Sequence, residues 1–327
     1  MFSPSFFPSF CRPFTPRRPR WLRRGGGLVF TLLLLPLVDC PPVWGQVGCG
    51  GRAPGLPPAG PLAIGHAGSG FLTLLRPFNP LPPSSRRSIR RALARGADGV
   101  EVDVRLSQDS VAVLYHDPQL ESMTTGAGCV SQTPARALAR LDYRVRWPYR
   151  WFQPQERVRR LDSLLAYLHR RPSFPFLHLD LHEDDPCATN DLARDAALAR
   201  QLQALVQRYR VPAGQLTIIS SRPAMLRRLG QLLPAVGLGL EVDDAAYPAA
   251  LARLDSLPGV GAVVLHKDAF SPERLAQLHA LGRQVIVFGG RSARAVGRVV
   301  AIGPDAYEVD NLRQLQRTLR RRSIHGR

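Results

Sequence analysis

The chain has 327 residues, 45% of them apolar, and a formal net charge of +19 at pH 7. This length and composition exclude a wholly disordered chain and suffice for one large domain or two small ones. The charge does not predict a nucleic-acid partner, because Lys267 is the only lysine and the arginines are scattered without interleaved aromatic residues. We interpret the arginines as residues on solvated helix faces, where they can also attract anionic lipid or anionic substrate.

The N-terminus has the layout of a secretory signal. Residues 12–24 are basic and proline-rich, residues 28–38 form an apolar run too short to span a bilayer, and residues 43–45 provide the cleavage positions. We therefore expect a signal peptide over 1–45, a flexible Gly/Pro-rich leader over 46–60, and export to the periplasm or the extracellular space. Cys40 and Cys49 follow imperfect lipobox sequences, so a lipid-anchored, membrane-associated form is the alternative.

The cysteines predict neither a disulfide framework nor a metal site. Cys49, Cys129 and Cys187 would remain after cleavage, and they are odd in number and lack CxxC spacing. One pair could still form in an oxidising compartment.

The first predicted elements are a strand and a helix. Residues 61–66 (PLAIGH) read as a short buried strand ending at His66, and a loop follows as far as Pro83. Ser84 or Ser85 can cap a helix that runs to about Arg95, with Gly96 as its stop.

Residues 98–117 are predicted to form a hairpin. Two valine-rich runs, 99–106 and 111–116, are separated by only four residues, which is too few for a parallel crossover. This pairing places His116 opposite Val102 or Asp103. Because side chains alternate along a strand, Glu101, Asp103 and Arg105 share one face, and two carboxylates and a histidine lie close together.

The remainder predicts a barrel. We interpret residues from about 107 to 157 as an insertion over one rim, and its aromatic residues Trp147, Tyr149, Trp151 and Phe152 as ordinary packing or a lipid-facing lip. Strands and helices then alternate: a helix at 161–169, strand 176–182, a helix within 191–208, strand 216–221, helix 223–233, strand 236–242, helix 249–257, strand 260–266, helix 272–281, strand 284–289, helix 293–302, strand 306–310 and a last helix to about 321.

Eight core strands with helices between them favour a (β/α)8 TIM barrel over 61–321, followed by a basic tail at 322–327. The first strand is not followed by a Gly-x-Gly-x-x-Gly turn, which argues against a dinucleotide-binding fold. In such barrels the site lies at the carboxyl ends of the strands. That rule brings together His66, Glu101, Asp103, His116, Asp180 and His182.

These residues suit a metal-assisted reaction. The carboxylates Glu101, Asp103 and Asp180 form an all-oxygen set typical of Ca²⁺ or Mg²⁺. His66 and His116 can serve as general acid and base beside it, an arrangement that suits displacement at a phosphodiester. The alternative is a transition-metal site formed by His178, Asp180 and His182, which lie on one strand face.

The chain resembles the glycerophosphodiester phosphodiesterase family, within the superfamily of phospholipase-C-like barrels, over about residues 62–315. The resemblance rests on these motifs: Ile64-Gly65-His66 with Gly68, residues 96–103 (GADGVEVD), Tyr115-His116-Asp117, residues 124–128 (TTGAG), Asp180, and Ile219-Ser220-Ser221. It implies that His66 and His116 are the catalytic pair, that Glu101, Asp103 and Asp180 hold the metal, and that the hairpin begins the family's insertion. It does not assign acid and base between the two histidines.

The chain also departs from the family pattern. Ala67 replaces the arginine of the family's His-Arg-Gly, and Pro83-Ser84-Ser85 replaces its Glu-Asn-Thr. Asp180-Leu181-His182 stands where the family has Glu-x-Lys. Gly68 and His182 are candidate contacts to the substrate phosphate.

The expected function is hydrolysis of a small phosphodiester, either a glycerophosphodiester or a related lipid headgroup diester, to a glycerol phosphate and an alcohol. A non-catalytic cell-surface barrel that binds anionic headgroups or glycans is the alternative. A related enzyme that cleaves intact phospholipid is a third possibility and would need the aromatic lip.

Overall fold

The computed structural model describes residues 60–73, 79–144, 154–188 and 191–325, all within one compact unit that spans residues 46–327. The predicted signal peptide, the leader before residue 60, and the aromatic residues Trp147, Tyr149, Trp151 and Phe152 lie outside the described residues. Across the described ranges, no helix combines the length and the apolar character needed to cross a bilayer.

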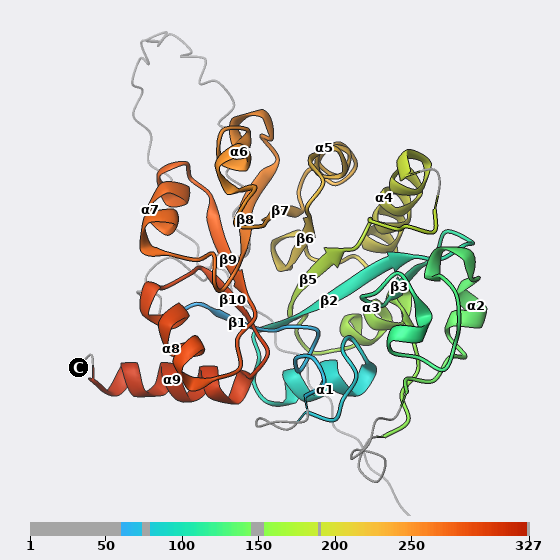
Figure 1. Ribbon diagram of the computed structural model, residues 1–327, viewed down its shortest axis with the longest axis horizontal. Coiled ribbons are helices and arrows are strands. Elements are labelled where there is room, and N and C mark those ends of the chain that lie inside the picture. Colours follow the sequence, from blue (N-terminus) through green and yellow to red (C-terminus); the bar gives the residue numbers. More distant parts are fainter. Residues whose placement is uncertain (1–59, 74–78, 145–153, 189–190, 326–327) are drawn as a thin grey trace, which may run out of the picture. The chain divides into compact units, whose positions relative to one another are not determined.

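Eight parallel strands form a closed barrel, which confirms the predicted fold (Figure 1). β1 (Leu62–Gly65) pairs in parallel with both β2 (Gly99–Leu106) and β10 (Ala306–Val309), so the first and last strands close the sheet. The other strands of the barrel follow in sequence order: β5 (Phe176–Leu181), β6 (Leu216–Ser220), β7 (Gly237–Val242), β8 (Val260–His266) and β9 (Gln284–Phe288).

Helices lie between successive barrel strands (Figure 1). They are α1 (Arg86–Ala94), α3 (Leu161–His169), α4 (Asp191–Arg208), α5 (Pro223–Leu232), α6 (Tyr247–Leu251), α7 (Pro272–Ala280) and α8 (Ala293–Ile302), with α9 (Leu312–His325) after the last strand. The main apolar core lies between barrel and helices. A smaller apolar cluster inside the barrel is formed by Ile64, Ile219, Ala262, Val264, Ile286 and Ala306.

Local signals explain the boundaries of α1. The Ser85 side chain accepts a hydrogen bond from the Ser88 backbone N–H, which satisfies one of the free donors at the helix start. Gly96 follows the helix with a φ of 77°, in the left-handed region that glycine adopts without steric cost. Both features match the predicted cap and stop.

Between β2 and α3 the chain forms β3 (Ala112–Leu114), β4 (Arg159–Arg160), the short helix α2 (Ala135–Leu138) and two 3-10 turns. β3 is antiparallel to β2, with Leu114 opposite Val104. The Tyr115 N–H then donates to the Asp103 carbonyl at 3.2 Å. A disulfide between Cys129 and Cys187 ties this segment to the loop after β5.

Three predicted boundaries are wrong. The strand predicted at 111–116 is regular only over Ala112–Leu114, and the last helix continues to His325. The helix predicted at 249–257 is α6 at Tyr247–Leu251 followed by a 3-10 turn at Leu254–Ser256. Pro248 explains the earlier start of α6, because proline has no N–H to donate and is favoured in a first helical turn.

Candidate active site

Three carboxylates meet at the carboxyl-terminal mouth of the barrel. Glu101 and Asp103 are alternate residues of β2, and Asp180 lies on β5 opposite Asp103. Oxygen atoms of the three side chains lie within 4.8 Å of one another. Glu101 is 1% exposed and Asp103 is 2% exposed, whereas Asp180 is half-buried and opens to the mouth.

The hydrogen bonding of the acids fits a cation. Glu101 Oε2 accepts from the Ala67 N–H at 2.6 Å, but the buried Glu101 Oε1 has no hydrogen-bond partner within the described part of the chain. Burial, with the nearby charge of Asp103, raises the pKa of Glu101 well above its usual value. A divalent cation would satisfy the free oxygen and offset the repulsion, and the all-oxygen donor set suits Ca²⁺ or Mg²⁺.

His66 is held by an aspartate from the last strand. Its Nδ1 lies 2.9 Å from Asp310 Oδ1, and its Nε2 lies 3.9 Å from Glu101 Oε2. Arg291 Nε lies 3.4 Å from Asp310 Oδ2, on the far side of that carboxylate. Burial alone lowers the pKa of His66, but the hydrogen bond and charge of Asp310 raise it to about 9. His66 therefore keeps Nε2 directed at the acidic cluster.

His116 lies on the other side of the mouth and is more open. Its Nδ1 lies 2.6 Å from Asp117 Oδ1, and its side chain is 38% exposed, against 16% for His66. The Phe71 ring lies between the two histidines, with centroid distances of 5.2 Å to His66 and 5.4 Å to His116. The structure therefore brings both predicted histidines to one mouth, each with a carboxylate at Nδ1.

His182 points at the acids. Its Nε2 lies 3.2 Å from Asp103 Oδ1 and 3.3 Å from Asp180 Oδ2. Burial lowers its pKa, but hydrogen bonds with Asp103 and Asp180 raise it to about 10. Asp103, His116 and His182 also place ligand atoms within 4.8 Å of one another. His178 instead pairs with the buried Glu308 at 2.5 Å and belongs to neither cluster, which disfavours the transition-metal alternative.

Gly68 has a packing role in this structure. Its N–H donates to the carbonyls of Gly65 and Glu101 at 3.1 and 3.2 Å. A Cβ atom at this position would lie 2.8 Å from the backbone nitrogen of Ile89, so only glycine lets the loop approach α1 this closely.

Two departures from the family pattern support the acidic cluster. Ala67 and Ser84 both have positive φ, 45° and 51°, which is uncommon outside glycine. The Ser84 N–H donates to the Ala67 carbonyl at 2.9 Å, and its hydroxyl donates to Asp103 Oδ2 at 2.8 Å. The Ala67 N–H holds Glu101. The altered residues thus orient two of the three carboxylates.

Asp310 and Arg105 are positioning residues that sequence reasoning missed. Asp310 is 244 residues after His66 in the sequence, but closure of the barrel puts the end of β10 beside His66. Arg105 was placed on the correct face without a role. Its guanidinium donates to the carbonyls of His116 at 2.6 Å, His182 at 3.1 Å and Asp184 at 2.9 Å. It therefore anchors both loops that carry these histidines.

Comparison with known proteins finds relatives that are named phosphodiesterases. A mouse glycerophosphodiester phosphodiesterase 1 is 25% identical over 224 residues, which is 63% of this chain and 66% of the relative. A Mycobacterium tuberculosis protein named probable glycerophosphodiester phosphodiesterase 1 is 47% identical over 60 residues, 18% of this chain and 22% of the relative. The chain thus matches less than two thirds of the length of these relatives.

Solved structures share the fold. A Silicibacter pomeroyi protein assigned as a glycerophosphoryl diester phosphodiesterase superposes with a TM-score of 0.70 at 22% identity, covering 81% of this chain and 95% of that protein. An Oleispira antarctica phosphodiesterase, solved with the product sn-glycerol-3-phosphate, gives a TM-score of 0.66 at 23% identity, covering 80% and 97%. The model of the glycerophosphoryl diester phosphodiesterase family matches residues 81–314, and the chain therefore belongs to that family.

Proposed function

We propose that the chain is an exported, divalent-metal-dependent phosphodiesterase that hydrolyses glycerophosphodiesters to a glycerol phosphate and an alcohol. The observation that carries this proposal is the set of three carboxylates, one with a free buried oxygen, between two carboxylate-backed histidines. Family membership supports the reaction class. The Cys129–Cys187 disulfide supports export, since disulfides persist in oxidising compartments.

Glu101, Asp103 and Asp180 would hold Ca²⁺ or Mg²⁺, which supplies positive charge to the phosphoryl oxygens when bound. His66 and His116 would move protons at their Nε2 atoms, because Nδ1 of each ring is engaged by a carboxylate. Asp310 and Asp117 fix the ring orientations, and Asp310 also stabilises the protonated imidazole of His66.

Two steps complete the reaction. A glycerol hydroxyl attacks phosphorus and gives its proton to one histidine, while the bond from phosphorus to the leaving alcohol breaks and the other histidine protonates that oxygen. Water then opens the resulting cyclic phosphate with the two protonation roles exchanged, which leaves a glycerol phosphate. His182 stands in the position of the family's lysine and places a cationic side chain next to Asp103 and Asp180.

Turnover of glycerophosphocholine with added Ca²⁺ or Mg²⁺ tests the proposal. His66→Ala and His116→Ala should each lower kcat by about 10²–10⁴-fold, the usual size of an acid–base contribution. His279→Ala is the matched control, because His279 lies on α7 and pairs with Asp305 at 2.9 Å. Equal turnover in all three variants and wild type would refute the assignment. The non-catalytic alternative predicts ligand-induced thermal stabilisation without turnover.

A further inference from the structure

Two neighbouring helices on the outside of the barrel carry arginines and no acidic residue. α1 reads RRSIRRALA and α9 reads LRQLQRTLRRRSIH. They meet just after α1, where the Gln316 side chain of α9 donates to the carbonyls of Arg95 and Gly96 (Figure 1). Together with α3 on the other side of α1, they form what we call the basic face.

A groove of about 590 Å³ runs between α1 and α9. Four arginines line it from the two helices and the residue after α1: Arg91, Arg95, Arg313 and Arg317. The ion pair of Arg291 with Asp310 also lines it. Among the residues that the structure describes, no carboxylate lies within 4.0 Å of these four guanidinium groups. Partial burial and the charge of Arg313 lower the pKa of Arg91, and burial with the charges of Arg91 and Arg313 lowers that of Arg95 to about 10. With five arginines and one aspartate along it, the groove holds an excess of positive charge that an anion would relieve.

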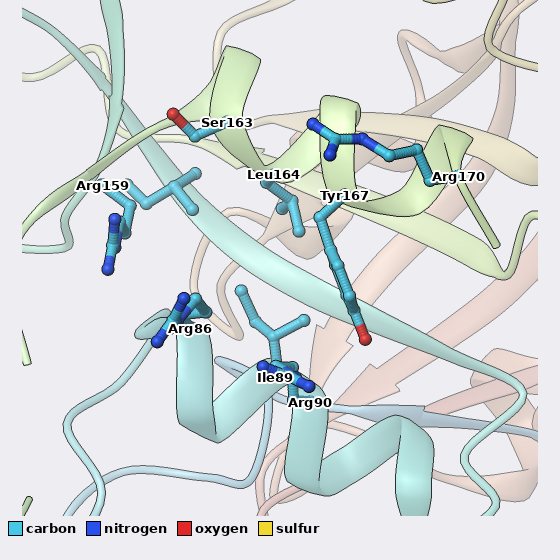
Figure 2. Close-up of a pocket in the computed structure, with 9 residues that line it drawn as sticks. Arg86, Ile89, Arg90, Arg159, Ser163, Leu164, Tyr167 and Arg170 are labelled. Carbon is cyan, nitrogen blue, oxygen red and sulfur yellow. The ribbon is translucent and has the colours of Figure 1, made fainter. Parts of the chain in front are cut away.

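A second hollow, of about 250 Å³, lies on the other side of α1, against α3 (Figure 2). Arginines surround it: Arg86 and Arg90 from α1, Arg159 from β4 just before α3, and Arg170 just after α3 (Figure 2). The Arg90 guanidinium lies 5.7 Å from the centroid of the Tyr167 ring. Two acidic residues close in sequence to these arginines form ion pairs with other arginines: Glu156 pairs with Arg87, and Asp162 pairs with Arg160.

The floor of this second hollow is apolar. Ile89, Leu114 and Leu164, all less than 9% exposed, line it together with the Tyr167 ring. A rim of guanidinium groups above an apolar floor suits an amphiphile that carries an anionic phosphate next to hydrocarbon. It suits single-stranded nucleic acid less well, because stacking surfaces for successive bases are not interleaved with these arginines.

We propose that the basic face docks the protein on an anionic lipid bilayer, with lipid phosphates seated in the α1–α9 groove and in the hollow between α1 and α3. Two grooves on either side of one helix present charge over a broad surface, as an extended bilayer requires. Each arginine near a membrane rich in anionic lipid strengthens partitioning by roughly fivefold, and the effect falls with salt. The proposal does not depend on the catalytic assignment, since the arginines substituted below lie on the helices α1 and α9 and not among the residues assigned to catalysis.

Sedimentation with vesicles of phosphatidylcholine, with or without phosphatidylglycerol, tests this surface on the full chain. Wild type should partition onto anionic vesicles and be released by high salt. Arg86→Gln/Arg90→Gln and Arg313→Gln/Arg317→Gln should each weaken partitioning by about tenfold or more. Arg200→Gln/Arg227→Gln, on exposed positions of α4 and α5, is the control with the same loss of charge. Wild type and all variants carry the same N-terminal segment, so differences in partitioning between them come from the substituted arginines.

Arg313→Lys/Arg317→Lys keeps the charge and should keep partitioning within a few-fold of wild type. Turnover of soluble glycerophosphocholine serves as the folding control and should be unchanged in every variant. Three results would overturn the proposal: equal loss in the face and control variants, no preference of wild type for anionic vesicles, or tighter binding to a single-stranded oligonucleotide than to vesicles. If a few millimolar inorganic phosphate released wild type from the vesicles at constant ionic strength, the grooves would be binding sites for a free anion and not for a bilayer.

Discussion

The two histidines at the barrel mouth, His66 and His116, are held in place in different ways. His66 follows β1 and is held by Asp310 after β10, and both residues are attached to strands of the closed barrel. His116 follows the short strand β3, uses the adjacent Asp117, and depends on Arg105 to hold its backbone. His66 is therefore fixed by the barrel strands. His116 is fixed by contacts within the segment between β2 and α3. Substitutions should therefore affect the two sides in different ways.

The largest loss of turnover is expected from a substitution at Asp103, which lies between the two histidines. Its carboxylate accepts from Ser84, contacts His182 and belongs to both side-chain clusters that could hold a metal. Asp103→Asn should lower kcat by on the order of 10³-fold, because a metal contributes several kcal/mol of charge stabilisation to the transition state. Ca²⁺ binding measured by calorimetry should weaken in parallel. Asp98→Asn, which alters a carboxylate at the opposite end of β2, serves as a comparison, and equal effects of the two substitutions would contradict the assignment.

The barrel-held side is tested at Asp310. Asp310→Asn should lower turnover by about 10²-fold, because a misoriented His66 ring loses its reactive geometry. In metal-free protein it should also lower the pKa of His66 from about 9, which histidine NMR can follow.

The same substitution has a defined effect on stability. The pKa of His66 is higher in the folded chain than its ordinary 6.5, so protonated His66 stabilises the fold fully below about pH 6.5. This contribution is lost as the pH rises through about 9. Denaturation of metal-free protein at pH 6 and pH 9.5 should show a smaller pH-dependent loss in Asp310→Asn than in wild type. If both proteins lost the same stability between the two pH values, and the pKa of His66 were unchanged, Asp310 would not be the residue that raises the pKa of His66.

The second side is tested at Arg105. Arg105→Met removes the donors to three carbonyls, and each lost hydrogen bond from a charged group costs about 1.5–3 kcal/mol. We expect turnover to fall by about tenfold, with Arg105→Lys intermediate because lysine keeps the charge but not the planar fork. The pKa of His66 should stay unchanged in both variants, which distinguishes local loosening from collapse of the whole mouth.

The smallest effect on turnover is expected from the disulfide. Cys129→Ser/Cys187→Ser removes a crosslink between residues 58 positions apart, which should lower the free energy of unfolding by about 2–4 kcal/mol. Turnover of the folded protein should change only a few-fold, because the disulfide joins the segment between β2 and α3 to the loop after β5 and is not part of the acidic cluster or the histidine pair. Chemical denaturation with and without reductant measures the effect, and wild-type stability that is insensitive to reductant would contradict it.

The same contrast explains what the sequence could predict. The eight strands, a cap of α1 at Ser84 or Ser85 and the β2–β3 hairpin come from local patterns; the strands and the hairpin are present, and Ser85 is the cap. The pairing of His66 with Asp310 depends on contact between residues 244 positions apart, and periodicity carries no information about it. The Cys129–Cys187 pairing was open for the same reason.

The acidic cluster was predictable because Glu101 and Asp103 are alternate residues of one strand and Asp180 lies on the strand beside it. The supporting roles of Ala67 and Ser84 were not, since they depend on positive φ angles that only the folded loop shows. The division of the arginines into a basic face with two grooves likewise appears only when α1, α3 and α9 are assembled.

The most direct test of the central claim is turnover of glycerophosphocholine by metal-stripped wild-type chain, followed by ³¹P NMR before and after addition of Ca²⁺ or Mg²⁺. The account predicts that a glycerol phosphate signal grows only after the metal is added, and that Asp103→Asn does not recover at the same metal concentration. Equal turnover with and without metal, or no turnover with either ion, would contradict it.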